Sequence, residues 1–225
     1  MINEVLWIVF ALINFTMVTI IYRIFGKQGL FVWIGMSTVV ANIQVVKTIE
    51  MFGLTATLGN IIYGTAFLAT DILNEKYGKQ EAKRAVWLGF ATLISMTVMM
   101  QISLYFTPAP NDVAQGAMKT LFEFLPRVAG GSLLAYIVSQ YVDVLIYAKL
   151  KALLPDNKWL WLRNNGSTMI SQLLDSFVFC FVAFFGEFPA NVWFEIFITT
   201  YFIKFIVAAL DTPFLYLAKQ FPRRQ

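Results

Sequence analysis

Long apolar stretches alternate with short polar ones along this chain. A helix needs about 20 mainly apolar residues to cross a membrane core about 30 Å thick. A tight linker at Gly53 separates the second apolar stretch from the third, so these two should form an antiparallel pair. The pattern predicts an all-α integral membrane protein, a bundle of about seven helices in a single domain, residues 1–225. The expected spans are 5–25, 30–51, 54–73, 85–106, 128–150, 166–186 and 192–217.

Two further segments refine this outline. Residues 107–126 contain two early prolines and Asp112, which is typical of an external loop, and residues 115–125 could form a short amphipathic helix within it. The first residues lack a basic region followed by a small-residue cleavage site. We therefore expect residues 5–25 to be a retained first helix.

Lysine and arginine are distributed unevenly between the two predicted sides. If the short segment after the third span is cytoplasmic, thirteen of the seventeen cations lie on that side. Cytoplasmic loops carry an excess of Lys and Arg, so we expect the N-terminus outside and the C-terminus inside. The thirteen are Arg23, Lys27, Lys76, Lys79, Lys83, Arg84, Lys149, Lys151, Lys158, Arg163, Lys219, Arg223 and Arg224.

Composition supports a membrane protein and excludes several chemistries. The chain is 59% hydrophobic and only 13% charged, so little of it remains for a water-soluble domain. It has no histidine, which excludes zinc sites and catalytic triads built on histidine. The single cysteine, Cys180, excludes an intramolecular disulfide and should be a buried thiol. We expect no cofactor, no metal site and no nucleic-acid partner.

Polar side chains nevertheless interrupt the predicted spans. A charged side chain near the bilayer centre costs about 2.5–3.5 kcal/mol on insertion scales, so it usually faces a bundle interior or a cavity. Residues three, four and seven apart share one helix face, which groups the polar residues into stripes with a carboxylate on each. The stripes are Asn60, Gly64, Phe67 and Asp71; Tyr136, Gln140, Asp143 and Tyr147; Thr168, Gln172, Asp175 and Phe179; and Thr200, Lys204, Val207 and Asp211.

A five-residue pattern occurs twice in consecutive spans. Residues 139–143 and 171–175 both read SQxxD, 32 residues apart, in helices expected to run in opposite directions. This is weak evidence for an inverted repeat. Aspartate carboxylates and glutamine amides together would offer acceptors and donors to a planar heterocycle, and the nearby tyrosine and phenylalanine rings would offer stacking faces.

Each of these residues also has a structural interpretation. Ser and Gln within spans often bond only to neighbouring helices. Lys204 could pair with Asp175 or Asp211 as structure, as a gate or as both. Asp71 lies within one turn of the basic segment, where it could snorkel or cap.

Three short motifs resemble the queuosine precursor transporter family: Phe67-Leu68-Ala69-Thr70-Asp71, then Asn74-Glu75-Lys76-Tyr77-Gly78, then Ala82-Lys83-Arg84. The resemblance extends over roughly residues 37–217 and includes polar positions at Asn42, Gln140, Asp143, Asp175 and Lys204. Many members of that family have six spans that begin near the second one here. Residues 5–25 therefore look like an added helix.

The resemblance implies a multi-pass protein of the prokaryotic inner or plasma membrane. Its ligand would be 7-cyano-7-deazaguanine, 7-aminomethyl-7-deazaguanine or queuine, taken up to make the modified tRNA nucleoside queuosine. One carboxylate can accept hydrogen bonds from both N1–H and the 2-amino group of a deazaguanine. We expect Asp143 or Asp175 in that role. Gln140, Gln172 and Asn42 would contact the remaining polar atoms, Lys204 would lie near the carbonyl, and Asp71 and Asp211 would serve as gate or coupling residues.

Three functions stay open on the sequence. The first is a secondary carrier with a polar site at the membrane midplane. The second is a substrate-binding subunit that needs a separate ATP-driven module, since the chain has no GxxxxGK[ST] loop of its own. The third, from another class, is an intramembrane enzyme or a structural membrane protein. Membrane lipid and a nucleobase-like small molecule are the expected partners, and a homodimer stays open.

Overall fold

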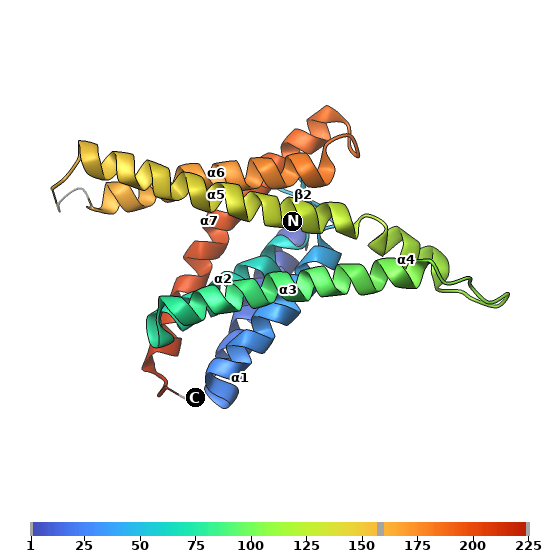
Figure 1. Ribbon diagram of the computed structural model, residues 1–225, viewed down its shortest axis with the longest axis horizontal. Coiled ribbons are helices and arrows are strands. Elements are labelled where there is room, and N and C mark those ends of the chain that lie inside the picture. Colours follow the sequence, from blue (N-terminus) through green and yellow to red (C-terminus); the bar gives the residue numbers. More distant parts are fainter. Residues whose placement is uncertain (1, 157–159, 224–225) are drawn as a thin grey trace. The chain divides into compact units, whose positions relative to one another are not determined.

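The N-terminal helix folds back on itself at one glycine. The computed structural model describes residues 2–156 and 160–223. Helix α1 (Ile2–Gln44) is continuous except at Gly26, where φ is 58° and ψ is −139°. A positive φ is readily adopted only by glycine, so the chain reverses here and α1 becomes two antiparallel arms (Figure 1). The expected break between spans 5–25 and 30–51 is therefore found at Gly26.

A β-hairpin follows α1 where the sequence predicted helix. Strands β1 (Thr48–Met51) and β2 (Leu54–Thr57) pair antiparallel, with Met51 opposite Leu54. Phe52 and Gly53 form the two-residue turn, and both have positive φ, as the common hairpin turns require. The spans expected at 30–51 and 54–73 are thus shorter as helices. The sequence predicted continuing spans here because this segment is rich in apolar and β-branched residues.

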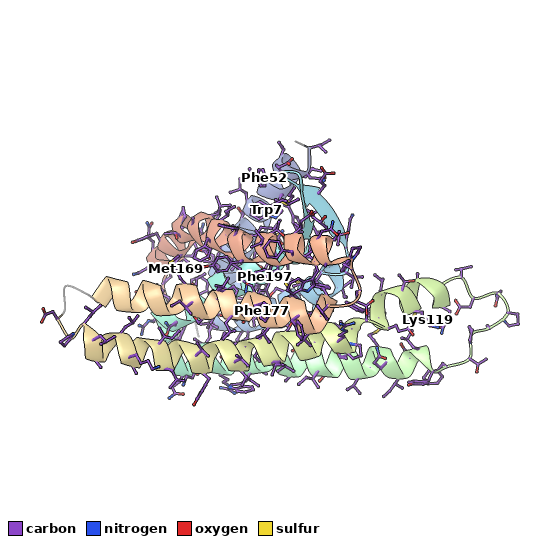
Figure 2. The ribbon with its side chains drawn as sticks, turned by 90° about the horizontal axis from the view of Figure 1, so that it is seen from above. Trp7, Phe52, Lys119, Met169, Phe177 and Phe197 are labelled. Carbon is purple, nitrogen blue, oxygen red and sulfur yellow. The ribbon has the colours of Figure 1, made fainter. Side chains whose placement is uncertain are left out.

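The start of α1 covers the free edge of this hairpin. The Asn3 side-chain amide donates to the Glu50 carbonyl at 2.9 Å, and the Phe52 backbone N–H donates to Glu4 Oε1 at 3.0 Å. Trp7 and Met51 belong to the same buried cluster, and Figure 2 labels Trp7 and Phe52 near this end. An open strand edge in lipid would leave backbone groups unsatisfied. The contacts from α1 satisfy the Glu50 carbonyl of β1 and the Phe52 N–H of the turn.

The chain forms two compact units: residues 1–126 with 202–225, and residues 127–201. The first contains α1, the hairpin, α2 (Asn60–Tyr77), α3 (Lys79–Leu104) and the short α4 (Gln115–Phe122). The second contains most of α5 (Leu125–Leu153) and all of α6 (Leu160–Phe184). The last helix, α7 (Ala190–Gln220), begins in the second unit and ends in the first.

The membrane architecture is confirmed in its main feature. Apart from the hairpin, the regular elements of the described chain are helices. Helical segments long and apolar enough to cross a membrane are Ile2–Gln44, Lys79–Leu104, Gln115–Ser139 and Ala190–Gln220. The short helix expected at 115–125 is α4. The count of seven spans and the orientation stay predictions.

The segment predicted as a basic loop is almost entirely helical. Helix α2 ends at Tyr77 and α3 begins at Lys79, so Gly78 alone connects them, with φ of 92°. Lys79, Lys83 and Arg84 lie in the first turns of α3 rather than in a loop. The absence of a Cβ allows glycine this backbone conformation, and no loop longer than one residue is required.

Unit 1 packs α2 tightly against α7. A Cβ placed on Gly64 would lie 2.1 Å from Val207 Cγ1. On the other side of α2, the Trp33 indole N–H donates to Thr65 Oγ1 at 3.0 Å and links α2 to α1. Small residues commonly allow such close approach between helices in membranes. The packing of α2 therefore depends on a glycine facing α7.

We predict that Gly64→Ala destabilises the protein by about 1–3 kcal/mol, because the added methyl group overpacks the contact with Val207. Reversible unfolding in mixed detergent micelles measures this. Gly130→Ala is the matched control, since a Cβ there meets nothing within 4 Å, and it should be neutral or slightly stabilising. Adding Val207→Ala to Gly64→Ala should recover part of the loss. Equal stability of Gly64→Ala and the wild type would contradict the packing argument.

Candidate functional site

Two of the predicted polar stripes face each other in unit 1. The stripe on α2 contains Gly64 and Asp71, and the stripe on α7 contains Val207 and Asp211. Gly64 lies against Val207. Further along both helices, Lys219 Nζ lies 2.7 Å from Glu75 Oε1. The two helices therefore run parallel with a constant offset.

Asp71 and Asp211 lie between these two contacts. Their carboxyl groups are close enough to interact electrostatically. Asp211 is buried, with 8% of its surface exposed, whereas Asp71 is exposed on the isolated chain. The neighbours Leu68 and Ile72 are fully buried in the apolar core. This brings together the two residues that the sequence assigned to gating or coupling.

One turn beyond the pair, α2 is fastened to the end of α7. The Lys76 ammonium donates to the backbone carbonyls of Lys219 at 2.7 Å and Phe221 at 2.6 Å. A cation at a helix C-terminus satisfies carbonyls that have no partner within the helix. Glu75 and Lys219 lie beyond the predicted spans, and the hydrogen bond from Lys219 lowers the pKa of Glu75. On the acid side, the contact is thus lost when the pH falls through that lowered pKa.

The same end of unit 1 is held to α1 and α3. Lys27, just after the Gly26 turn, lies 3.3 Å from Glu81 of α3. The Tyr22 ring contacts the Tyr77 ring edge-on at 6.5 Å, and the Arg23 guanidinium lies 5.5 Å from the centre of the Phe221 ring. The Gly26 turn, the Gly78 turn and the end of α7 therefore share one end of the unit. In the sequence these cations indicated only the orientation, and their contacts were not predicted.

In unit 2, the SQxxD pattern brings α5 and α6 together. The Ser139 hydroxyl of the first copy lies 3.1 Å from Asp175 Oδ1 of the second and also 3.1 Å from the Tyr136 carbonyl of its own helix, so two acceptors share its one hydrogen. A Cβ on Gly131 would lie 3.4 Å from the Ala183 nitrogen. Ser139 lies eight residues after Gly131 on α5, whereas Asp175 lies eight residues before Ala183 on α6. The two helices are therefore antiparallel, and they lie side by side in Figures 1 and 2. The approach is close because Gly131, Ala135 and Ser139 are small and four residues apart.

Arg127 caps one end of this helix pair, where α5 begins and α6 ends. Its Nε donates to the Val182 carbonyl at 2.7 Å, and its other nitrogens contact the Phe185 carbonyl and the Glu187 carboxylate. The last turn of α6 gains donors for carbonyls that the helix leaves unpaired. In the sequence, the position of Arg127 just before the expected span 128–150 was the only signal for this role.

Aromatic rings fill the contact between α6 and the start of α7. Trp193 lies 6.0 Å from Phe197 in a stacked arrangement and 6.1 Å from Phe177 edge-on. Its indole N–H donates to the Cys180 carbonyl at 2.9 Å. Figure 2 labels Phe177 and Phe197 on these two helices. Cys180 is a buried thiol, as predicted.

The remaining predicted site residues have various surroundings. Asn42 is buried in α1, and its amide donates to the Thr38 carbonyl at 2.7 Å. Gln172 on α6 and Lys204 on α7 are half-buried. The side chains of Gln140 and Asp143 lie outside the described residues, although the helical backbone of α5 includes both positions. The two compact units are each defined internally, and Asn42 and Lys204 belong to unit 1 while Gln172 and Asp175 belong to unit 2.

The carboxyl groups of these sites can accept hydrogen bonds and exchange protons. Asp175 offers a carboxylate that is held in position by Ser139. Asp71 and Asp211 offer a second pair of carboxyl groups. Within the described residues, no group of three or more His, Cys, Asp or Glu side chains is placed to hold a metal ion.

Comparison with known proteins identifies related chains. Residues 57–218 match the family described as "Putative vitamin uptake transporter". A protein of Bacillus subtilis (strain 168) named "Probable queuosine precursor transporter" is 58% identical over 98% of this chain and 96% of its own length. No solved structure matches significantly.

More distant relatives carry the same name. The "Queuosine precursor transporter" of Escherichia coli (strain K12) is 27% identical over 75% of this chain and 74% of its own length. The "Probable queuosine precursor transporter" of Haemophilus influenzae (strain ATCC 51907 / DSM 11121 / KW20 / Rd) is 26% identical over 71% of this chain and 66% of its own. These relatives are named as transporters, and none is named as an enzyme.

We predict that Ser139 and Asp175 are energetically coupled by about 0.5–1.5 kcal/mol, in the range measured for hydrogen bonds between membrane helices. A double-mutant cycle with Ser139→Ala and Asp175→Asn, read out as the free energy of unfolding, measures this coupling. Ser37→Ala is the control, because Ser37 is also buried but donates to the Ile34 carbonyl of its own helix. Paired with Asp175→Asn, it should show no coupling. Additive effects of Ser139→Ala and Asp175→Asn would refute the contact.

Proposed function

Since this chain belongs to the queuosine precursor transporter family, we propose that it is a secondary carrier for queuosine precursors. It is a multi-pass protein of the bacterial cytoplasmic membrane and not an enzyme. We propose 7-cyano-7-deazaguanine, 7-aminomethyl-7-deazaguanine or queuine as the substrate. The substrate would bind a polar site within the helices and be released on the other side by alternating access.

The observation that carries this proposal is the hydrogen bond between Ser139 and Asp175. A carboxylate within an apolar helix pair is costly unless it has a role or a partner. Asp175 is half-buried rather than enclosed. Its position is fixed relative to α5 by the contact with Ser139, and a carboxylate is the acceptor that a ligand with N–H donors requires.

A deazaguanine has the donors that such a carboxylate accepts. Its N1–H and 2-amino group point in the same direction, so one carboxylate can accept both hydrogen bonds. We assign this role to Asp175 or Asp143. The α5–α6 register that brings Ser139 to Asp175 would bring position 143 opposite Ser171, so the second SQxxD carboxylate would occupy the equivalent place in an inverted pair.

Four further residues would contact the remaining polar atoms of the substrate. Gln140 and Gln172 follow the serines of the two motifs and would serve the remaining polar atoms of the base. Asn42 would do the same from α1, and Lys204 would donate to the 6-oxo group. These assignments rest on residue chemistry and on helix position, and each is open to substitution.

We predict that purified protein is stabilised by at least one of the three 7-deazaguanine bases and less by guanine. A ligand that binds only the folded state raises its stability by about 2.7 kcal/mol at a hundredfold excess over Kd. Thermal-shift measurement against guanine, the two precursors and queuine provides the test. Stabilisation by none of them would refute the proposed substrate class.

We predict that Asp175→Asn weakens precursor binding about 10- to 100-fold, because a hydrogen bond to a charged group contributes about 1.5–3 kcal/mol. Uptake of radiolabelled precursor into proteoliposomes, together with the thermal-shift Kd, measures the loss. Asp156→Asn is the matched control, since Asp156 is exposed after the end of α5. Asp143→Asn should resemble Asp175→Asn. Normal uptake by both Asp143→Asn and Asp175→Asn would refute the site.

The same uptake experiment distinguishes a carrier from a subunit of an ATP-driven system. Wild-type protein alone should exchange labelled for unlabelled precursor across the proteoliposome membrane. If the protein binds precursor but never moves it, a separate ATP-driven module is required, and the carrier proposal is wrong.

A further inference from the structure

Two carboxyl groups in unit 1 have a setting that the substrate site does not explain. Asp71 on α2 and Asp211 on α7 lie between the Gly64–Val207 contact and the Glu75–Lys219 ion pair. Gly64 and Val207 differ in number by 143, as do Asp71 and Phe214. Asp211 therefore lies three residues from the position opposite Asp71, which corresponds to about 4.5 Å along the helix axis.

The contacts on either side of the pair fix this separation. A sideways shift of α2 away from α7 would break the contact between Gly64 and Val207. Lys76 holds the last turn of α7 by two carbonyls. Because both ends of the helix pair are fastened, the two carboxyl groups are held near each other as part of the fold.

Neither carboxyl group has a cationic partner or a hydrogen-bond donor among the contacts of the described residues. Asp211 is nevertheless more than nine-tenths buried. The residues around it are apolar: Leu68 and Val207 are buried, and Phe214 packs on Phe15 with ring centres 5.3 Å apart. Two negative charges in such surroundings repel each other and each loses hydration.

The charged groups on the neighbouring helices are directed elsewhere. From α1, Lys27 pairs with Glu81 of α3, and Arg23 and Tyr22 contact the Phe221 ring. On α2, Glu75 and Lys76 contact the end of α7. On α7, Lys204 lies two turns before Asp211 and has contacts of its own. At the start of α3, Lys83 and Arg84 are exposed.

We infer that Asp71 and Asp211 together bind one transported proton, and that this proton couples precursor import to the proton gradient. The inference rests on the proposed carrier function. One bound proton leaves the pair with a single negative charge, because one carboxyl group is then a neutral acid and the other a carboxylate. Asp71 is the exposed member and exchanges the proton with water, since a charged side chain on a membrane helix faces a water-filled space rather than lipid. Asp211 is the buried member that retains it.

Proton binding and release balance over one cycle. The pair takes up one proton from the outer side and releases the same proton on the cytoplasmic side, with no change in oxidation state. A gradient of one pH unit then supports at most about tenfold accumulation of precursor per proton. Substrate exchange in the absence of a gradient needs no net proton movement.

The test compares two kinds of transport in proteoliposomes with radiolabelled 7-cyano-7-deazaguanine, 7-aminomethyl-7-deazaguanine and queuine. Wild-type protein should accumulate a precursor up to about tenfold under an acid-outside gradient of one pH unit, and should also exchange it without a gradient. Asp71→Asn and Asp211→Asn should lose accumulation and keep exchange within about threefold of the wild type. Asp156→Asn, the matched control, should keep both.

Each alternative result has a separate meaning. Wild-type exchange without any response to the gradient overturns proton coupling and leaves the carrier standing. Wild-type protein that neither exchanges nor accumulates overturns the carrier itself. Gradient-driven accumulation by both Asp71→Asn and Asp211→Asn, or loss of exchange in both, overturns the assignment of the proton to this pair.

A second measurement does not depend on transport or on the folding of the variants. A hydrophobic carbodiimide modifies protonated carboxyl groups in apolar surroundings, so wild-type protein at neutral pH should be labelled at Asp71 or Asp211 and not at Asp156. Mass spectrometry of the digested protein locates the label. Labelling should slow as the pH is raised. Absence of label from both members of the pair would overturn the inference.

Discussion

The close approach of α2 and α7 at Gly64 determines the arrangement of unit 1. Without a Cβ at this position, the two parallel helices come near enough for side chains on either side of the contact to meet. The same register places Asp71 near Asp211 and aligns Glu75 and Lys76 with the end of α7. A bulky residue would push the helices apart and misalign every one of these contacts. The packing of one small residue therefore sets the electrostatics of the whole helix pair.

The two groups of carboxylates differ in how they are supported. Asp175 in unit 2 accepts a hydrogen bond from the neighbouring helix, which fixes the direction of its carboxylate. Asp71 and Asp211 in unit 1 have mainly apolar neighbours and each other. A supported carboxylate suits a ligand that brings donors, whereas an unsupported pair suits a small cation that neutralises charge. The two units therefore offer different chemistry within one chain.

The sequence predicted helix faces well and the relations between helices poorly. The stripe rule grouped Gly64 with Asp71 and Val207 with Asp211, and the structure brings these stripes together. Helical periodicity shows which residues share a face, but it contains no information about which face of another helix lies opposite. The Ser139–Asp175 hydrogen bond illustrates this limit, because the repeated motif was visible while its pairing was not.

The hairpin at residues 48–57 was missed for a different reason. Its residues are apolar enough to continue a membrane helix, and the turn at Phe52 and Gly53 offered a single glycine as a signal. The contacts that stabilise it come from Asn3 and Glu4, almost fifty residues away. The cation-rich contacts around Lys76 and Lys219 were likewise beyond local patterns, since they join segments more than 140 residues apart.

The single-residue connection at Gly78 has a mechanical consequence. Only one residue, Gly78, lies between α2 and α3. A large tilt of one helix would therefore move the other as well. The outer surface of α3 exposes large apolar side chains, including Trp87 and Met99, which would lie in the hydrocarbon layer. If the chain works by the alternating access proposed above, rocking of α2 would move this apolar surface through the lipid. The thickness and viscosity of the surrounding bilayer would then affect the rate of the proposed cycle.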